Sequence, residues 1–135
     1  MRRAAFALAL TVLFLTAAWA SDFTLQPGTV VPGAQGVAKL DHDANGNAVI
    51  SVEAKHLAPP NSLTPPKSYY VVWIQPRDAQ PQMAGVLSVD PTKEDGAFKT
   101  ATPYKNFEVL VTAEDNPRPE SPSGVQILKG TIATR

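Results

Sequence analysis

The 13 prolines of this chain all lie beyond residue 20, and they fall between short apolar stretches. Proline lacks a backbone donor and breaks helix interiors, so these positions divide the chain into short segments. No long segment carries apolar residues at the 3.6-residue spacing of an amphipathic helix. Short runs rich in β-branched and aromatic residues, separated by turn residues about every 8–12 positions, are typical of an antiparallel sandwich or barrel.

Residues 1–20 have the layout of a secretory signal peptide. Met1-Arg2-Arg3 is positively charged, and Ala4 to Ala18 is almost entirely apolar. In Ala18-Trp19-Ala20, small residues occupy the two positions that signal peptidase recognises. The apolar run is shorter than the about 20 residues of a membrane-spanning helix. We therefore expect cleavage after Ala20, export to the bacterial periplasm or the medium, and no membrane span in the mature protein.

Composition excludes several classes of function. There is no cysteine, so the chain has no disulfide, thiolate metal site or thiol nucleophile. An exported, cysteine-free domain fits a bacterial envelope better than the disulfide-dense small domains that eukaryotes secrete. Removal of Arg2 and Arg3 leaves ten basic and twelve acidic side chains, dispersed along the chain. Nucleic-acid binding and binding to an anionic membrane both need clustered positive charge, so neither is expected.

One β-domain is predicted over residues 37–135, preceded by a lead-in segment, 21–36, with room for one short edge strand. Alternation and turn residues predict seven strands. Together they indicate an all-β fold, an immunoglobulin-like antiparallel β-sandwich of about seven strands. The expected strands are 37–42, 47–57, 69–75, 84–89, 97–102, 107–114 and 125–133.

Two strands show which faces should be buried. In strand 107–114, alternation predicts a core face and a solvated face that carries Glu108, Thr112 and Glu114. Strand 69–75 is apolar on both faces, so it should be central, with Trp73 anchoring the core. The core face of strand 107–114 consists of Phe107, Val109, Val111 and Ala113.

The first hairpin can be predicted to its register. A two-residue loop at Asn45-Gly46 would set charged residues against core residues. A three-residue loop, 44–46, instead pairs Leu40 with Ile50. We expect this second loop, a type I turn led by Asp43 with Gly46 in the left-handed conformation.

Four segments occur in a recognisable order and spacing: Tyr70-Val71-Val72-Trp73-Ile74, Gly85-Val86-Leu87, Phe107 to Glu114 and Pro122-Ser123-Gly124. Together they resemble the extracytoplasmic C-terminal domain of bacterial anti-sigma-K factors and their stand-alone secreted relatives. The resemblance spans about Lys67 to Leu128 and implies an immunoglobulin-like sandwich in the envelope. It does not imply sigma-factor binding, because the family's cytoplasmic His/Cys zinc-type domain and transmembrane helix have no counterpart here.

We expect a non-catalytic binding or protein-interaction module that recognises an unidentified envelope protein or ligand. Alternating strand directions place the proline-dense loops 58–67 and 116–124 at one end of the domain, where sandwiches usually bind partners. Tyr104, between Pro103 and Lys105, is the aromatic residue expected to be most exposed. The candidate contact residues are Pro59, Pro60, Pro65, Pro66, Tyr104 and Arg118.

The alternative is a periplasmic carrier of Ca²⁺ or Cu²⁺. Asp41, Asp43 and Asn45 match the opening of a calcium loop, but position 12, which should be a bidentate glutamate, is Val52. His42 and His56 should lie too far apart to share a metal. No nucleophile–base pattern for hydrolysis occurs, so neither an enzyme nor a cofactor is predicted.

Overall fold

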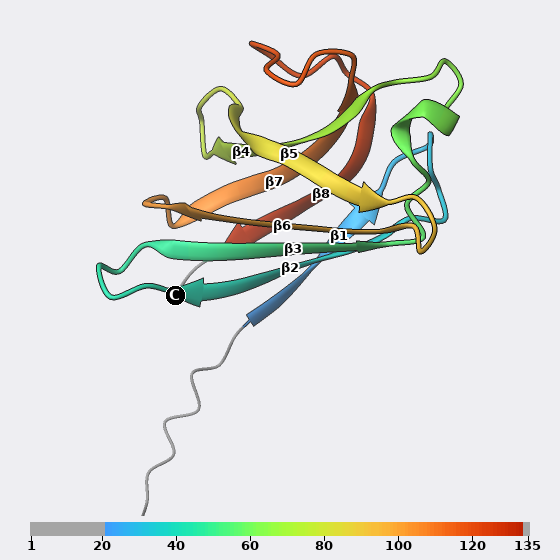
Figure 1. The fold of residues 1–135 in the computed structure, drawn as a ribbon. Helices are drawn as coiled ribbons and strands as arrows, with labels where there is room; N and C mark the ends of the chain where they lie inside the picture. The colour runs from blue at the N-terminus through green and yellow to red at the C-terminus, as the bar shows by residue number, and fades with distance from the viewer. Residues whose placement is uncertain (1–20, 134–135) are drawn as a thin grey trace, which may run out of the picture.

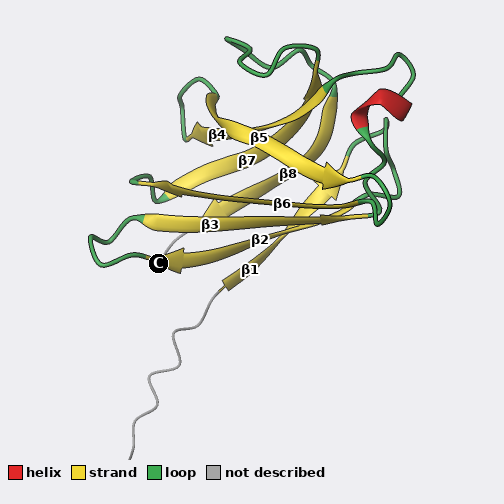
Figure 2. Cartoon of the chain, viewed as in Figure 1, coloured by secondary structure: helices red, strands yellow, loops and turns green. Residues whose placement is uncertain are grey.

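A computed structural model describes residues 21–133, which form eight antiparallel strands and one short 3-10 helix (Figures 1 and 2). The predicted signal peptide lies outside the described residues. Within them, no helix combines the length and apolar character that crossing a membrane requires. The elements are β1 (Ser21–Pro27), β2 (Gln35–His42), β3 (Ala48–Lys55), η1 (Pro60–Ser62), β4 (Tyr69–Pro76), β5 (Gln82–Asp90), β6 (Asp95–Thr102), β7 (Asn106–Glu114) and β8 (Gln126–Ala133).

The strands close into a barrel in the order β1-β2-β3-β6-β5-β4-β7-β8, with β8 beside β1. The predicted immunoglobulin-like sandwich, which the family resemblance also implied, is therefore wrong. The lead-in segment supplies a full strand, β1, that pairs with β2 and then reaches β8 through Gln26 and Pro27. At the other corner, β5 pairs with β4 and, through Ser88–Asp90, with β6. Strands shared between the two sheets leave no open sheet edge of the kind a sandwich has.

Strand boundaries and buried faces follow the sequence pattern closely. All seven expected strands are present, and β4 is central, between β5 and β7. The predicted core face of β7 is buried in the main apolar cluster, together with Leu25 of β1 and Ile50 of β3. Burial of such side chains contributes about 25 cal/mol per Å² of apolar surface, so the cluster is the main source of stability.

The register predicted for the first hairpin is confirmed. Leu40 pairs with Ile50, and Gly46 has a φ of +80°. The Gly46 N–H donates to the Asp43 carbonyl over 3.1 Å, and the Asp43 N–H donates to the Asn47 carbonyl over 3.1 Å. Register follows the buried face because a slip by one residue would turn every core side chain outward.

The prediction that one face of β7 is solvated is partly wrong. Thr112 and Glu114 are buried, with 1% and 3% of their surface exposed. Trp73 is fully buried, as expected, but it lies on the face of β4 opposite the core residues Val72 and Ile74, outside the main cluster. Its indole N–H donates to the Thr112 hydroxyl over 2.8 Å, which satisfies the polar atom that burial would otherwise leave unpaired. The second face of the β4–β7 pair is thus buried at Trp73, Thr112 and Glu114, while Glu108 and Leu110 on the same face are half-buried.

The loops gather at two ends of the barrel (Figure 1). The proline end consists of loops 28–34, 56–68, 91–94 and 115–125. The hairpin end consists of loops 43–47, 77–81 and 103–105, and β1 begins and β8 ends there. Loops 56–68, 91–94 and 115–125 share one end, as the alternation of strand directions predicted.

The corner between β1 and β8 offers a direct test of barrel closure. A Cβ added at Gly130 would lie 2.8 Å from the backbone oxygen of Thr24 and 2.6 Å from a methyl carbon of Leu25. We expect Gly130→Ala to destabilise the protein by about 1–3 kcal/mol, because β1 must move away from β8. Urea unfolding measures this change. Gly33→Ala is the matched control, since a Cβ at Gly33 meets nothing within 4 Å, and equal stability of the two variants would contradict the closure.

Candidate functional site

The proline end carries ten of the thirteen prolines. Proline restricts φ and reduces the freedom of the unfolded loop, so a proline-rich loop loses little entropy when it is ordered. The interior of the barrel is packed with apolar side chains, so a ligand or partner has to bind at the ends or on the outer surface. The prolines of the proline end are Pro27, Pro32, Pro59, Pro60, Pro65, Pro66, Pro91, Pro117, Pro119 and Pro122.

Two of these loops, 56–68 and 115–125, are joined into one surface. The Ser68 N–H donates to the Glu114 carbonyl over 3.0 Å, where β4 begins beside the end of β7. The ammonium of Lys67 lies 3.5 Å from a carboxylate oxygen of Asp115. The Leu57 N–H donates to the Glu94 carbonyl over 2.9 Å, which links loop 56–68 to loop 91–94. The loops therefore hold one another in position.

Buried polar groups anchor the same loops to the barrel. The Tyr70 hydroxyl donates to the Ala58 carbonyl, and burial raises the pKa of Tyr70 to about 12. The buried Glu114 carboxylate accepts the Ser123 N–H at 2.8 and 3.2 Å, and the Ser123 hydroxyl donates to the Ala113 carbonyl at 3.1 Å. Glu114 thus has a structural role in loop 115–125, which its place in an alternating strand did not reveal.

The large apolar side chains that stay exposed among the described residues are Val30 (41%) and Tyr69 (36%), and both belong to the proline end. Val30 is in loop 28–34, and Tyr69 begins β4 directly after loop 56–68. Tyr69 was not among the predicted contact residues. Because strand 69–75 is apolar on both faces, the sequence predicted that it is buried and did not indicate that Tyr69 is exposed.

The structure brings together most of the predicted contact residues. Pro65, Pro66 and Arg118 are exposed, while Pro59 and Pro60, at the start of η1, are half-buried. Their loops are the two that Lys67 and Ser68 join to Asp115 and Glu114.

Tyr104 differs from the other predicted contact residues. It lies at the hairpin end, is half-buried against the core, and its hydroxyl accepts a hydrogen bond from the Gln82 amide over 3.1 Å. It therefore does not share a surface with the proline loops.

In the acidic turn, 43–47, the carboxylate of Asp43 accepts hydrogen bonds from other residues of the same turn. One oxygen of Asp43 accepts the N–H groups of Asn45 and Asn47 at 2.9 and 3.0 Å, and the other accepts the Asn47 side-chain amide at 3.1 Å. The backbone and then the side-chain hydrogen bond from Asn47 lower the pKa of Asp43 below its usual 3.8. A cation at Asp41, Asp43 and Asn45 would compete with these bonds. Within residues 21–133, no three His, Asp or Glu side chains are grouped as a metal site would require.

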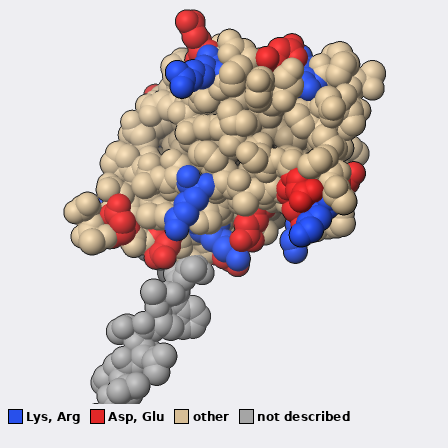
Figure 3. All heavy atoms as spheres, in the orientation of Figure 1, with Lys and Arg blue, Asp and Glu red and all other residues tan. Residues whose placement is uncertain are grey.

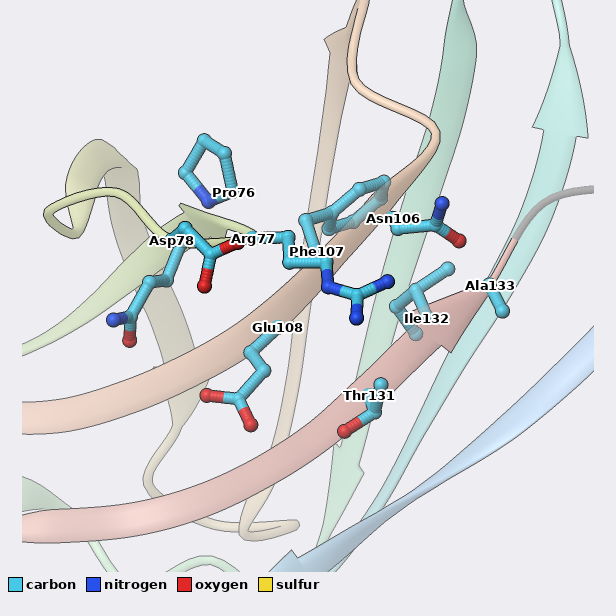
Figure 4. A pocket seen from close by; sticks show the side chains of 10 residues that line it. Pro76, Arg77, Asp78, Asn106, Phe107, Glu108, Thr131, Ile132 and Ala133 are labelled. Carbon is cyan, nitrogen blue, oxygen red and sulfur yellow. The ribbon is translucent and has the colours of Figure 1, made fainter.

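A separate hollow of about 380 Å³ opens at the hairpin end (Figure 4). It is bounded by the end of β4, the start of β7 and the end of β8. Arg77, Asn106, Phe107, Glu108 and Ile132 are among the residues that line it. No motif in the sequence predicted this hollow.

Charges of both signs are dispersed over the face seen in Figure 3, where Lys and Arg side chains alternate with Asp and Glu. In each ion pair found within residues 21–133, at least one of the two side chains is substantially exposed, so these pairs contribute little stability.

Comparison of the chain with protein-family models, curated proteins and solved structures finds no match.

Removal of the Tyr70 hydroxyl should loosen the proline end. In Tyr70→Phe the Ala58 carbonyl loses its partner, and we expect a loss of about 1 kcal/mol together with faster amide exchange at Leu63 and Lys67. The raised pKa adds a pH dependence: the wild-type protein should lose this contribution as pH rises above 10, through about 12. Tyr69→Phe is the control, and unchanged exchange in Tyr70→Phe would exclude the anchoring role.

The Asp43 carboxylate should stabilise the hairpin only while it is ionised. Because folding lowers its pKa, its contribution is present above pH 3.8 and disappears as pH falls through the folded-state pKa. Asp43→Ala should therefore be less stable than wild type near neutral pH, with the gap narrowing below pH 3.8. Thermal unfolding across pH measures the gap. The exposed Asp22→Ala serves as control, and a gap for Asp43→Ala that stays constant with pH would refute the assignment.

Proposed function

We propose that this chain is a non-catalytic protein-interaction module of the bacterial envelope that binds its partner through the proline end. The observation that carries the proposal is the placement of Val30 and Tyr69, the exposed large apolar side chains of the described residues, at the end where ten prolines gather. Export rests on the signal-like residues 1–20. The proposal does not use the resemblance to anti-sigma-K factors, whose implied fold the chain does not adopt.

The chemistry of this end suits a protein partner. Protein interfaces are enriched in tyrosine and arginine, and a few such side chains supply most of the binding energy. Tyr69 and Arg118 are of this kind, and both are exposed. Loops already held by Tyr70, Lys67 and Glu114 need little further ordering when they bind, which lowers the entropy cost of association.

A reaction is less well supported than binding. Catalytic sites usually combine clustered titratable groups with perturbed pKa values in a cleft. In residues 21–133, the pKa values that clearly depart from their ordinary values are those of Asp43, in an exposed turn, and Tyr70, whose hydroxyl is bonded to a loop carbonyl. Every buried side-chain N or O atom of this part of the chain has a hydrogen-bond partner. These groups are accounted for by structural roles.

Site-specific photo-crosslinking tests the proposal. A photoreactive amino acid replaces Pro66 or Arg118 at the proline end, or Ala79 at the hairpin end, and the protein is expressed in cells with its signal intact. We expect one discrete crosslinked protein from the first two positions and none from Ala79. Adding Tyr69→Ser should weaken crosslinking by about fivefold or more, as for loss of an interface anchor.

The control for Tyr69→Ser is Lys105→Ser, which changes an exposed residue at the hairpin end. Lys105→Ser should unfold at the wild-type urea concentration, because its side chain is exposed. Tyr69→Ser should unfold at a somewhat lower urea concentration, because Tyr69 is only 36% exposed, but it should remain folded under the crosslinking conditions. The proposal fails if Ala79 gives the same product as Pro66, or if neither proline-end position gives a product that Tyr69→Ser weakens.

A further inference from the structure

The hollow at the hairpin end is a second, independent candidate for binding, and the proposal for it does not rest on the proposed function. We propose that it binds a small organic carboxylate, with Arg77 pairing with the carboxylate and with Asn106 and Thr131 forming hydrogen bonds to the rest of the ligand. The hollow is formed by Gln75–Asp78, Asn106–Glu108 and Thr131–Ala133, and none of these segments belongs to the proline end.

The guanidinium of Arg77 lies over the hollow. The Arg77 backbone N–H donates to the Asn106 carbonyl over 3.3 Å, which holds the start of loop 77–81 against β7. Figure 4 shows the side chain passing Phe107 and pointing toward Ile132 and Asn106, away from Asp78. None of the ion pairs found within residues 21–133 involves Arg77. A guanidinium that has no carboxylate partner there can pair with one from a ligand, through two parallel hydrogen bonds.

The rest of the hollow offers polar groups above a packed base. Phe107 and Ile132, which are 2% and 0% exposed, form that base and hold the segments above them in place. The side-chain amide of Asn106 and the hydroxyl of Thr131 line the wall, where each can exchange hydrogen bonds with a carbonyl or amide group of a ligand. A volume of about 380 Å³ is within the usual range for small-molecule sites. These features fit a small carboxylate that also carries a carbonyl or amide group, either free or at the C-terminus of a polypeptide.

Charges of both signs surround the hollow. Glu108 pairs with Lys129 over 3.5 Å, and Asp78 lies on the side of the hollow away from the guanidinium tip. The Glu108 carboxylate is thus balanced by Lys129, and Arg77 is the cation among the lining residues. An anionic group of a ligand is therefore expected to pair with Arg77.

Titration of the isotope-labelled protein with N-acetylphenylalanine, followed by NMR, tests this proposal. N-acetylphenylalaninamide is the matched ligand control, because it keeps the apolar body and removes the charge. We expect saturable shifts at Asn106 and Thr131 with the acid only. Arg77→Gln should weaken binding by about tenfold or more, since it removes a charge-assisted pair. Lys99→Gln, which removes an exposed charge of β6 outside both candidate sites, should leave the affinity unchanged.

A short peptide ending in phenylalanine distinguishes the two sources of the carboxylate. Tighter binding of the peptide than of N-acetylphenylalanine assigns the hollow to polypeptide C-termini, and equal binding assigns it to small carboxylates; both support a carboxylate site. Equal shifts with acid and amide, no saturation at millimolar acid, or full affinity in Arg77→Gln would overturn the proposal. Because Arg77 is exposed, the variant should keep the wild-type stability, which urea unfolding verifies.

Discussion

The short pairing of β1 with β8 is the contact on which the architecture depends. Gln26 and Pro27 face Lys129 and Leu128 there, and this is the narrowest junction of the barrel. Without it, β1 and β8 would each present unpaired backbone groups at a sheet edge, which invites association with other chains. Closure also brings Leu25 into the core, where it is 1% exposed, and ties loop 28–34 to β8 through the Gly28 N–H. The positions of both barrel ends follow from this junction.

Much of the local structure could be predicted because it depends on neighbouring residues. Alternation located seven of the eight strands, and the buried face determined the register of the hairpin at Asp43–Asn47. Closure could not be predicted in the same way, since a sandwich and a barrel share the same alternating pattern. The distinction depends on β1, where only Phe23 and Leu25 mark an inward face in a segment with several polar residues.

The candidate sites show the same contrast. Proline-dense loops are visible in sequence, and strand alternation placed them at one end. The hollow around Arg77 was not predictable, because its three segments lie far apart along the chain and meet only where β4, β7 and β8 adjoin. The burial of Glu114 and Thr112 escaped prediction for a related reason. Their side chains are hydrogen-bonded to Ser123 and Trp73, partners that strand periodicity does not identify.

The orientation of the described ends has a practical consequence. Ser21 starts β1 and Ala133 ends β8 at the end of the barrel opposite the proline loops (Figure 1). A tag, fusion partner or solid support joined at either terminus would therefore leave Tyr69 and Arg118 facing outward. The same attachment after Ala133 would crowd Arg77, because Ala133 borders that hollow. Immobilising the protein through its N-terminal side is the arrangement that leaves the surroundings of Arg77 less obstructed.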